Sequence, residues 1–72
     1  HYTYDLLATV NRYLGNYPQA IRYGLLSVER AQATGDTAYL AYFYGRLAIL
    51  HEELNQWEAG LQFRYKSLVL LQ

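Results

Sequence analysis

The chain has 72 residues, with six Lys and Arg against six Asp and Glu, two His and no Cys. One small domain is the most that this length supports. A formal net charge of zero leaves no basic field for a phosphate backbone, so nucleic acid is not an expected partner. The lack of cysteine excludes a disulfide framework, a thiolate zinc site and a thiol nucleophile. It leaves the compartment open, either cytoplasmic or periplasmic.

Aromatic residues make up 17% of the chain, which is too many for a disordered linker, so we expect a packed core. No uncharged apolar stretch approaches the roughly 20 residues of a membrane span, and the closing run at residues 67–71 is only a few residues long. We therefore expect no part of the chain to insert into a membrane. Because the sequence begins at His1 without Met, we also expect it to be a piece of a longer protein.

The first predicted helix ends at Gly15, because glycine tolerates the positive φ that follows a helix end. Its apolar residues recur mostly at three- and four-residue steps, which places them on one side of the helix. They are Tyr4, Leu7, Ala8, Val10 and Leu14.

A second helix is predicted from Pro18, since proline fits the first position of a helix. Its apolar residues are Ala20, Ile21, Leu25, Val28 and Ala31. Gly35 predicts its end, and Asp36 and Thr37 are good N-caps for a third helix. The third helix reaches residues 54–56, and a fourth runs from about Trp57 to the end. The third has its apolar face at Leu40, Tyr44, Leu47, Ala48 and Leu50. Short connections predict antiparallel neighbours.

The second half of the sequence aligns with the first at a constant offset, by which Tyr4 aligns with Tyr44. We call this shift the repeat offset. Large residues fall on large ones and small residues on small ones, as expected when two helix pairs cross in the same way. We expect Ala20 and Gly60 to lie where helices approach closely. The matching pairs are Tyr4/Tyr44, Leu7/Leu47, Ala8/Ala48, Leu14/Leu54, Tyr17/Trp57, Ala20/Gly60, Ile21/Leu61, Tyr23/Phe63, Ser27/Ser67 and Val28/Leu68.

At these positions the sequence resembles the tetratricopeptide repeat (TPR) family. The residues that carry the resemblance are Tyr4, Leu7, Ala8, Gly15, Tyr17, Ala20, Tyr23 and Ser27. The unit is longer than the family's repeat of about 34 residues, and the sequence departs from the family pattern at Asn11, His51, Gly24 and Arg64. The resemblance implies an all-α fold of two antiparallel helix-turn-helix hairpins, residues 1–36 and 37–72, stacked as a right-handed solenoid fragment.

Longer repeats of this kind resemble those of bacterial sensor kinases, transcriptional regulators and other signalling proteins. The resemblance therefore implies a protein-interaction or sensory-regulatory scaffold module, with a protein or peptide partner, no cofactor and no catalysis of its own. The Lys/Asn clamp with which some family members hold a chaperone C-terminus is not matched, because Asp5 and Thr9 stand at two of its positions.

In this family the first helix of each repeat lines a concave groove. The resemblance places there Tyr2, Asp5, Thr9, Arg12, Tyr13, Tyr42, Gly45, Arg46, Ile49, Glu52 and Glu53. Tyr and Arg often anchor interfaces because they combine contact area with directed hydrogen bonds. We therefore take Tyr2, Arg12, Tyr13, Tyr42, Arg46 and Glu53 as candidate partner-binding residues. An ordinary solvated face is the alternative.

Catalytic and metal chemistry has weaker support in the sequence. His51, Glu52 and Glu53 lack the second His, four residues on, of a helical zinc site. We expect His51 to be half-buried between the repeats, in register with Asn11. The five glycines stand singly, so no phosphate-binding loop is predicted.

The last predicted helix has more apolar surface than one antiparallel neighbour can cover. Its apolar residues are Leu61, Phe63, Tyr65, Leu68, Val69, Leu70 and Leu71. We expect a further helix or repeat to pack there in the intact protein, or the chain to associate through this helix or through Tyr2 and Tyr4. Structural self-association is thus the alternative function.

Overall fold

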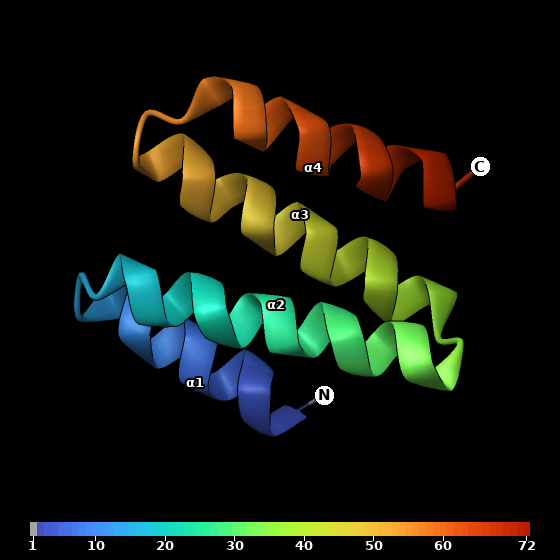
Figure 1. Cartoon of the computed structure of the whole chain (residues 1–72), viewed down its shortest axis with the longest axis horizontal. Coiled ribbons are helices and arrows are strands. Elements are labelled where there is room, and N and C mark those ends of the chain that lie inside the picture. Colours follow the sequence, from blue (N-terminus) through green and yellow to red (C-terminus); the bar gives the residue numbers. More distant parts are fainter. Residues whose placement is uncertain (1) are drawn as a thin grey trace.

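The computed structural model describes residues 2–72, with side chains from residue 3 onward, and over this range it holds four α helices and no strand. They are α1 (Tyr2–Tyr13), α2 (Tyr17–Thr34), α3 (Thr37–Glu53) and α4 (Trp57–Leu70). Consecutive helices run in opposite directions (Figure 1). The predicted all-α class and the order of the helices are confirmed. Across the described residues, none of these helices is long and apolar enough to cross a membrane.

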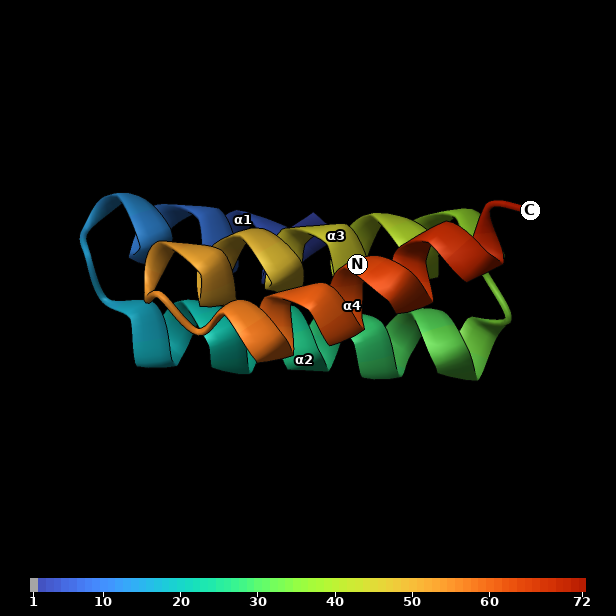
Figure 2. The ribbon, with the colours of Figure 1, turned by 90° about the horizontal axis from the view of Figure 1, so that it is seen from above.

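The helices form a flat, two-layered molecule whose Cα atoms span 31 × 27 × 13 Å. Seen from above, α1 and α3 lie along one side and α2 along the other (Figure 2). Helix α2 packs against both α1 and α3, and α3 packs against α4. Helices α2 and α3 are therefore the inner elements, each with a neighbour on both sides.

The turn after α1 and the turn after α3 have the same geometry and are related by the repeat offset. Each contains a left-handed residue, Gly15 with φ 76° and Asn55 with φ 60°, and glycine and asparagine tolerate this conformation best. The backbone N–H of Asn16 donates to the carbonyl of Asn11, and that of Gln56 to the carbonyl of His51, both at 2.8 Å. The repeat inferred from the sequence therefore extends to the backbone.

The polar residues Asn11 and His51 have a shared role in these two turns. The side chain of Asn16 donates to Asn11 Oδ1 at 3.2 Å, and His51 Nδ1 lies 2.6 Å from Gln56 Oε1. In each hairpin a polar side chain near the helix end thus bonds the residue five positions on. This contact accounts for a polar residue at both positions.

The connection between α2 and α3 follows its prediction. Gly35 has φ 70°, and its N–H bonds the last carbonyls of α2. Asp36 caps α3 by accepting a hydrogen bond from the backbone N–H of Tyr39 at 3.1 Å, which stabilises the helix start.

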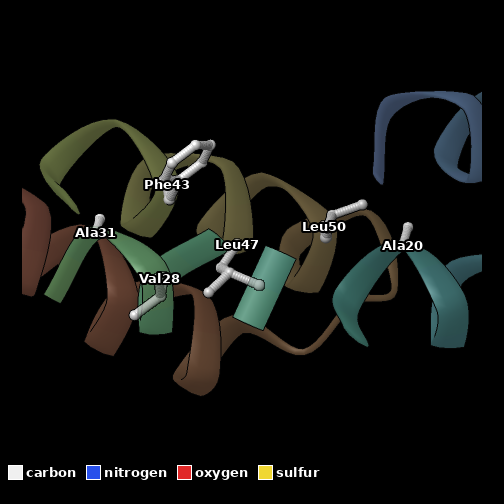
Figure 3. Close-up of a cluster of buried hydrophobic side chains, with 6 residues drawn as sticks. All are labelled: Ala20, Val28, Ala31, Phe43, Leu47 and Leu50. Atoms are coloured by element: carbon white, nitrogen blue, oxygen red, sulfur yellow. The ribbon is translucent and has the colours of Figure 1, made fainter. Parts of the chain in front are cut away.

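The core lies between α2 and α3 (Figure 3). It consists of Ala20, Val28, Ala31, Phe43, Leu47 and Leu50. Three residues of the predicted apolar faces, Val10, Leu14 and Leu25, are exposed. Leu14 lies in the turn beyond α1, and periodicity alone does not show whether a face has a neighbour to cover it.

Small residues allow the helices to approach closely. The predicted positions Ala20 and Gly60 are both buried. A Cβ at Gly60 would lie 2.9 Å from Glu52 Cγ and 3.4 Å from the carbonyl oxygen of Ala48, so α3 and α4 cross tightly there. Gly24 has the same role between α2 and α3, since its Cβ would lie 2.8 Å from Leu47 Cδ2.

The two hairpins share an aromatic stack but differ in exposure. Tyr4 and Tyr23 stack at 6.2 Å between ring centroids, and Tyr44 and Phe63 stack at 6.1 Å. Val28 is only 7% exposed, whereas Leu68, its equivalent, is 57% exposed. Helix α2 has α3 on its far side and α4 has no such neighbour among the described helices. The expected excess of apolar surface on the last helix is confirmed.

Replacing Ala20 with leucine should destabilise the chain by about 1–3 kcal/mol, because Ala20 is fully buried and a larger side chain would overpack the site. The matched Gln19→Leu change lies at an exposed position and should be nearly silent. Urea or thermal unfolding measures both. Equal stability of Ala20→Leu and the parent would show that the packing at this position is assigned wrongly.

Candidate functional site

Helices α1 and α3 face each other through polar side chains, which we call the α1–α3 seam. Its members are Asp5, Thr9, Arg12, Tyr42, Arg46 and Glu53. At one end, Arg12 donates two hydrogen bonds to Glu53, the Nε bond being 2.9 Å long. The hydroxyl of Tyr17 donates to the same carboxylate at 3.1 Å. A guanidinium and a carboxylate paired in this two-point way are also fixed in orientation.

This end of the seam shifts the protonation equilibria of its members. The hydrogen bond from Arg12 holds the pKa of Glu53 below its ordinary value, and the bond from Tyr17 adds to the effect. The same contact raises the pKa of Arg12. The pKa of Tyr17 is raised chiefly because its hydroxyl proton is donated to Glu53.

At the other end of the seam, Arg46 reaches from α3 to α1. Its guanidinium donates to Thr9 Oγ1 at 2.5 Å and to the hydroxyl of Tyr42 at 3.0 Å, and it lies 3.8 Å from a carboxylate oxygen of Asp5. The hydroxyl of Tyr42 donates to Asp5 at 3.4 Å. The seam is therefore linked at both ends between residues that are far apart in the sequence.

The structure divides the predicted partner-binding residues into groups. Across the seam, Arg12 pairs with Glu53 and Arg46 lies near Asp5. The charges of these candidate residues are therefore matched within the chain. Tyr13 is 81% exposed. Tyr2 lies outside the residues whose side chains are described. Two further residues of the predicted concave face, Gly45 and Ile49, line a groove between α3 and α4.

Two open grooves lie next to the seam. One, of about 450 Å³, is lined by Asp5, Ala38, Tyr39 and Tyr42; we call it the Tyr42 groove. The other, of about 420 Å³, lies between α3 and α4 and shares Ala38 and Tyr42 with the first. It also includes Gly45, Ile49, Arg64, Ser67 and Leu71; we call it the α3/α4 groove. Tyr42 itself is exposed. Both grooves are surface depressions with mixed polar and apolar lining, which suits contact with a peptide or a helix.

The triplet from His51 to Glu53 does not converge on one point. The ring of His51 stacks on Phe63 with 5.3 Å between centroids and bonds Gln56. Glu52 accepts two hydrogen bonds from Arg64 on α4, at 2.7 and 3.0 Å, and Glu53 pairs with Arg12. His51 is half-buried as expected, and each of the three side chains contributes to packing between helices.

No family model, curated protein or solved structure matches this chain.

The Arg12–Glu53 pair should couple the two halves of the chain by a modest amount. A double-mutant cycle of Arg12→Met and Glu53→Gln is expected to give a coupling of about 0.5–1 kcal/mol, because the pair is solvent-accessible although it is bidentate. Unfolding in urea measures it. The matched variant Glu29→Gln, at an exposed position of α2, should show no coupling to Arg12→Met. A coupling of zero for the seam pair would mean that it does not hold α3 against α1.

The same pair predicts how stability depends on pH. Since the pKa of Glu53 is lowered on folding, its contribution is present above the ordinary glutamate pKa and is lost as the pH falls through the folded value. The parent should thus exceed Glu53→Gln in stability at neutral pH, and the difference should shrink below about pH 4.5. Unfolding free energies measured from pH 7 to pH 3 test this. A difference independent of pH would contradict it.

Proposed function

We propose that this chain is a helical-repeat protein-interaction module of the tetratricopeptide type. In this proposal its two hairpins stack as a right-handed solenoid fragment. The module serves as a sensory or regulatory scaffold in a larger bacterial signalling protein, such as a sensor kinase or a transcriptional regulator. It binds a protein or peptide and has no catalysis of its own.

The observation that carries the proposal is the recurrence of structure at the repeat offset. The left-handed turn residues Gly15 and Asn55, the turn hydrogen bonds and the stacked aromatic pairs all repeat with this spacing. Repeats that place equivalent helices side by side give a continuous surface along their first helices, and such surfaces are used for binding.

The partner surface in this proposal is the Tyr42 groove. Its lining combines exposed tyrosine rings from α3 with Asp5 from α1, and aromatic side chains are the commonest anchors of protein interfaces. Arg46 stacks on the ring of Tyr42 with its guanidinium 5.6 Å from the centroid, which holds the ring in place. Arg12 and Glu53, paired with each other, then serve to position α3 beside α1.

Structural self-association is the second candidate function, and one observation favours it. Leu61, Tyr65, Leu68 and Leu71 of the last helix and its end are all more than half exposed. An apolar surface of this kind marks an interaction site on a folded protein.

A peptide-display library selected on the immobilised chain tests the first proposal. Selected peptides should bind the Tyr42→Ala variant at least about tenfold more weakly than the parent, as expected for an anchor residue. Tyr65→Ala is the matched control, because Tyr65 is an exposed tyrosine on α4, and it should bind the same peptides as the parent does. Circular dichroism checks that both variants remain helical. Peptides unaffected by Tyr42→Ala, or a library without binders, would contradict the proposal.

A further inference from the structure

Helix α3 packs into a groove formed by the first hairpin, and the second hairpin has an equivalent groove that is open. Helix α3 places Phe43, Leu47 and Leu50 in the core. The groove of α1 and α2 that receives it includes Asp5, Gly24 and Ser27 and retains a cavity of only about 10 Å³ beside α3.

The corresponding groove of the second hairpin is open. By the repeat offset, Gly45, Arg64 and Ser67 are the equivalents of Asp5, Gly24 and Ser27, and all three line the α3/α4 groove of about 420 Å³. Leu71, which also lines it, is the equivalent of buried Ala31. Among residues 2–72, no helix fills the α3/α4 groove as α3 fills the groove of the first hairpin.

The helix equivalent to α3 in the repeat is α1, and it presents the matching face to solvent. By the same offset, Leu6, Leu7, Val10 and Tyr13 are the equivalents of Arg46, Leu47, Leu50 and Glu53. Leu6 is 53% exposed and Val10 45%. We call Thr3, Leu6, Leu7, Val10 and Tyr13 the outer face of α1.

Where α3 makes polar contacts with α1, the equivalent positions of the outer face of α1 and of the α3/α4 groove are both apolar. Arg46 bonds Thr9 and approaches Asp5. At the equivalent positions Leu6 would meet Ile49 and Gly45. A leucine facing an isoleucine and a glycine is a matched apolar contact, just as the arginine facing threonine and aspartate is a matched polar one.

A second polar contact changes in the same concerted way. Glu53 accepts hydrogen bonds from Arg12 and Tyr17. In the equivalent arrangement Tyr13 would meet Glu52 and Trp57, so a tyrosine hydroxyl would donate to a carboxylate and the ring would lie against an exposed indole. The direction of the hydrogen bond is reversed, because the carboxylate now lies on the groove side, and the complementarity is retained.

Side-chain size is also compensated. In the core, the large Phe43 shares a cluster with the small Val28 and Ala31 (Figure 3). At the equivalent positions the small Thr3 would face the larger Leu68 and Leu71. Three independent groups of positions thus change together so that the outer face of α1 fits the α3/α4 groove.

We propose that copies of this chain associate head to tail, with the outer face of α1 of one copy seated in the α3/α4 groove of the next. The two surfaces differ, so the contact is heterologous and each copy can bind one neighbour at each end. This inference specifies the self-association role and does not depend on peptide binding at the Tyr42 groove, so either can fail without the other.

One residue opposes the contact. Arg64 stands at the position of Gly24, where the absence of a side chain admits Leu47. Its guanidinium is drawn aside by Glu52, but its stem limits how closely α1 of another copy approaches. The association is accordingly weaker than the internal packing of α3.

Sedimentation velocity of the full chain from micromolar to sub-millimolar concentration tests the proposal. The parent should show a weight-average mass that rises with concentration beyond a dimer. Leu6→Glu introduces a carboxylate into the outer face of α1, and Gly45→Glu introduces one into the α3/α4 groove; each variant alone should remain a monomer. The matched control Leu25→Glu, at an exposed leucine of α2, should associate as the parent does.

A mixture of the two blocked variants gives the decisive result. Each retains one intact surface, so Leu6→Glu and Gly45→Glu mixed in equal amounts should form a one-to-one heterodimer and nothing larger. Arg64→Ala should associate at least several-fold more tightly than the parent. Circular dichroism confirms that each variant is folded.

Three outcomes would overturn the proposal. A parent that stays monomeric at every concentration would exclude association of either kind. Association of Leu6→Glu alone would indicate that α4 pairs with α4 of another copy. A mixture of folded variants without heterodimer would show that the outer face of α1 and the α3/α4 groove do not bind each other.

Discussion

The contact between Leu47 and Gly24 determines where α3 lies. Leu47 is completely buried, and its side chain occupies the space that a Cβ at residue 24 would need. Because Leu47 belongs to the cluster that joins α2 to α3, this close approach sets the distance between these two helices, and α1, which packs on α2, lies beside α3. Arg12 and Arg46 then reach Glu53 and Thr9 across the seam. The polar seam is thus a consequence of apolar packing, to which it adds orientation and little energy.

Local geometry repeats in this chain, whereas burial does not. The turns at Gly15 and Asn55 depend on residues close in sequence, so both hairpins form them alike. Burial depends on neighbouring helices. Helix α2 packs against both α1 and α3, whereas α4 packs against α3 alone among the helices that the structure describes. This is why Leu68 is exposed where Val28 is buried, although the sequence treats the two positions as equivalent.

Most of the fold was predictable from the sequence, and the role of the charges was not. Glycine at the helix ends, Asp36 as a cap and the repeat offset predicted four helices in the right order. The spacing placed Val10, Leu14 and Leu25 on apolar faces, but periodicity does not show whether a neighbouring helix covers a face. The pairing of Arg12 with Glu53 requires the distance between α1 and α3. The sequence nevertheless held a hint of this pairing. By the repeat offset, Glu53 is the equivalent of Tyr13, and Arg12, of opposite charge, precedes Tyr13 in the sequence.

The polar groups of the seam also decide which helix fits which groove. If Leu6 stood in place of Arg46, Thr9 would lose its guanidinium donor and Asp5 would lose a nearby positive charge. Conversely, Arg46 placed against Ile49 and Gly45 would be partly desolvated without an acceptor. Each interchange replaces a matched contact by a mismatched one, so the two grooves discriminate between α3 and α1. Apolar packing holds the helices together in either arrangement, and the few polar positions make one arrangement better than the other.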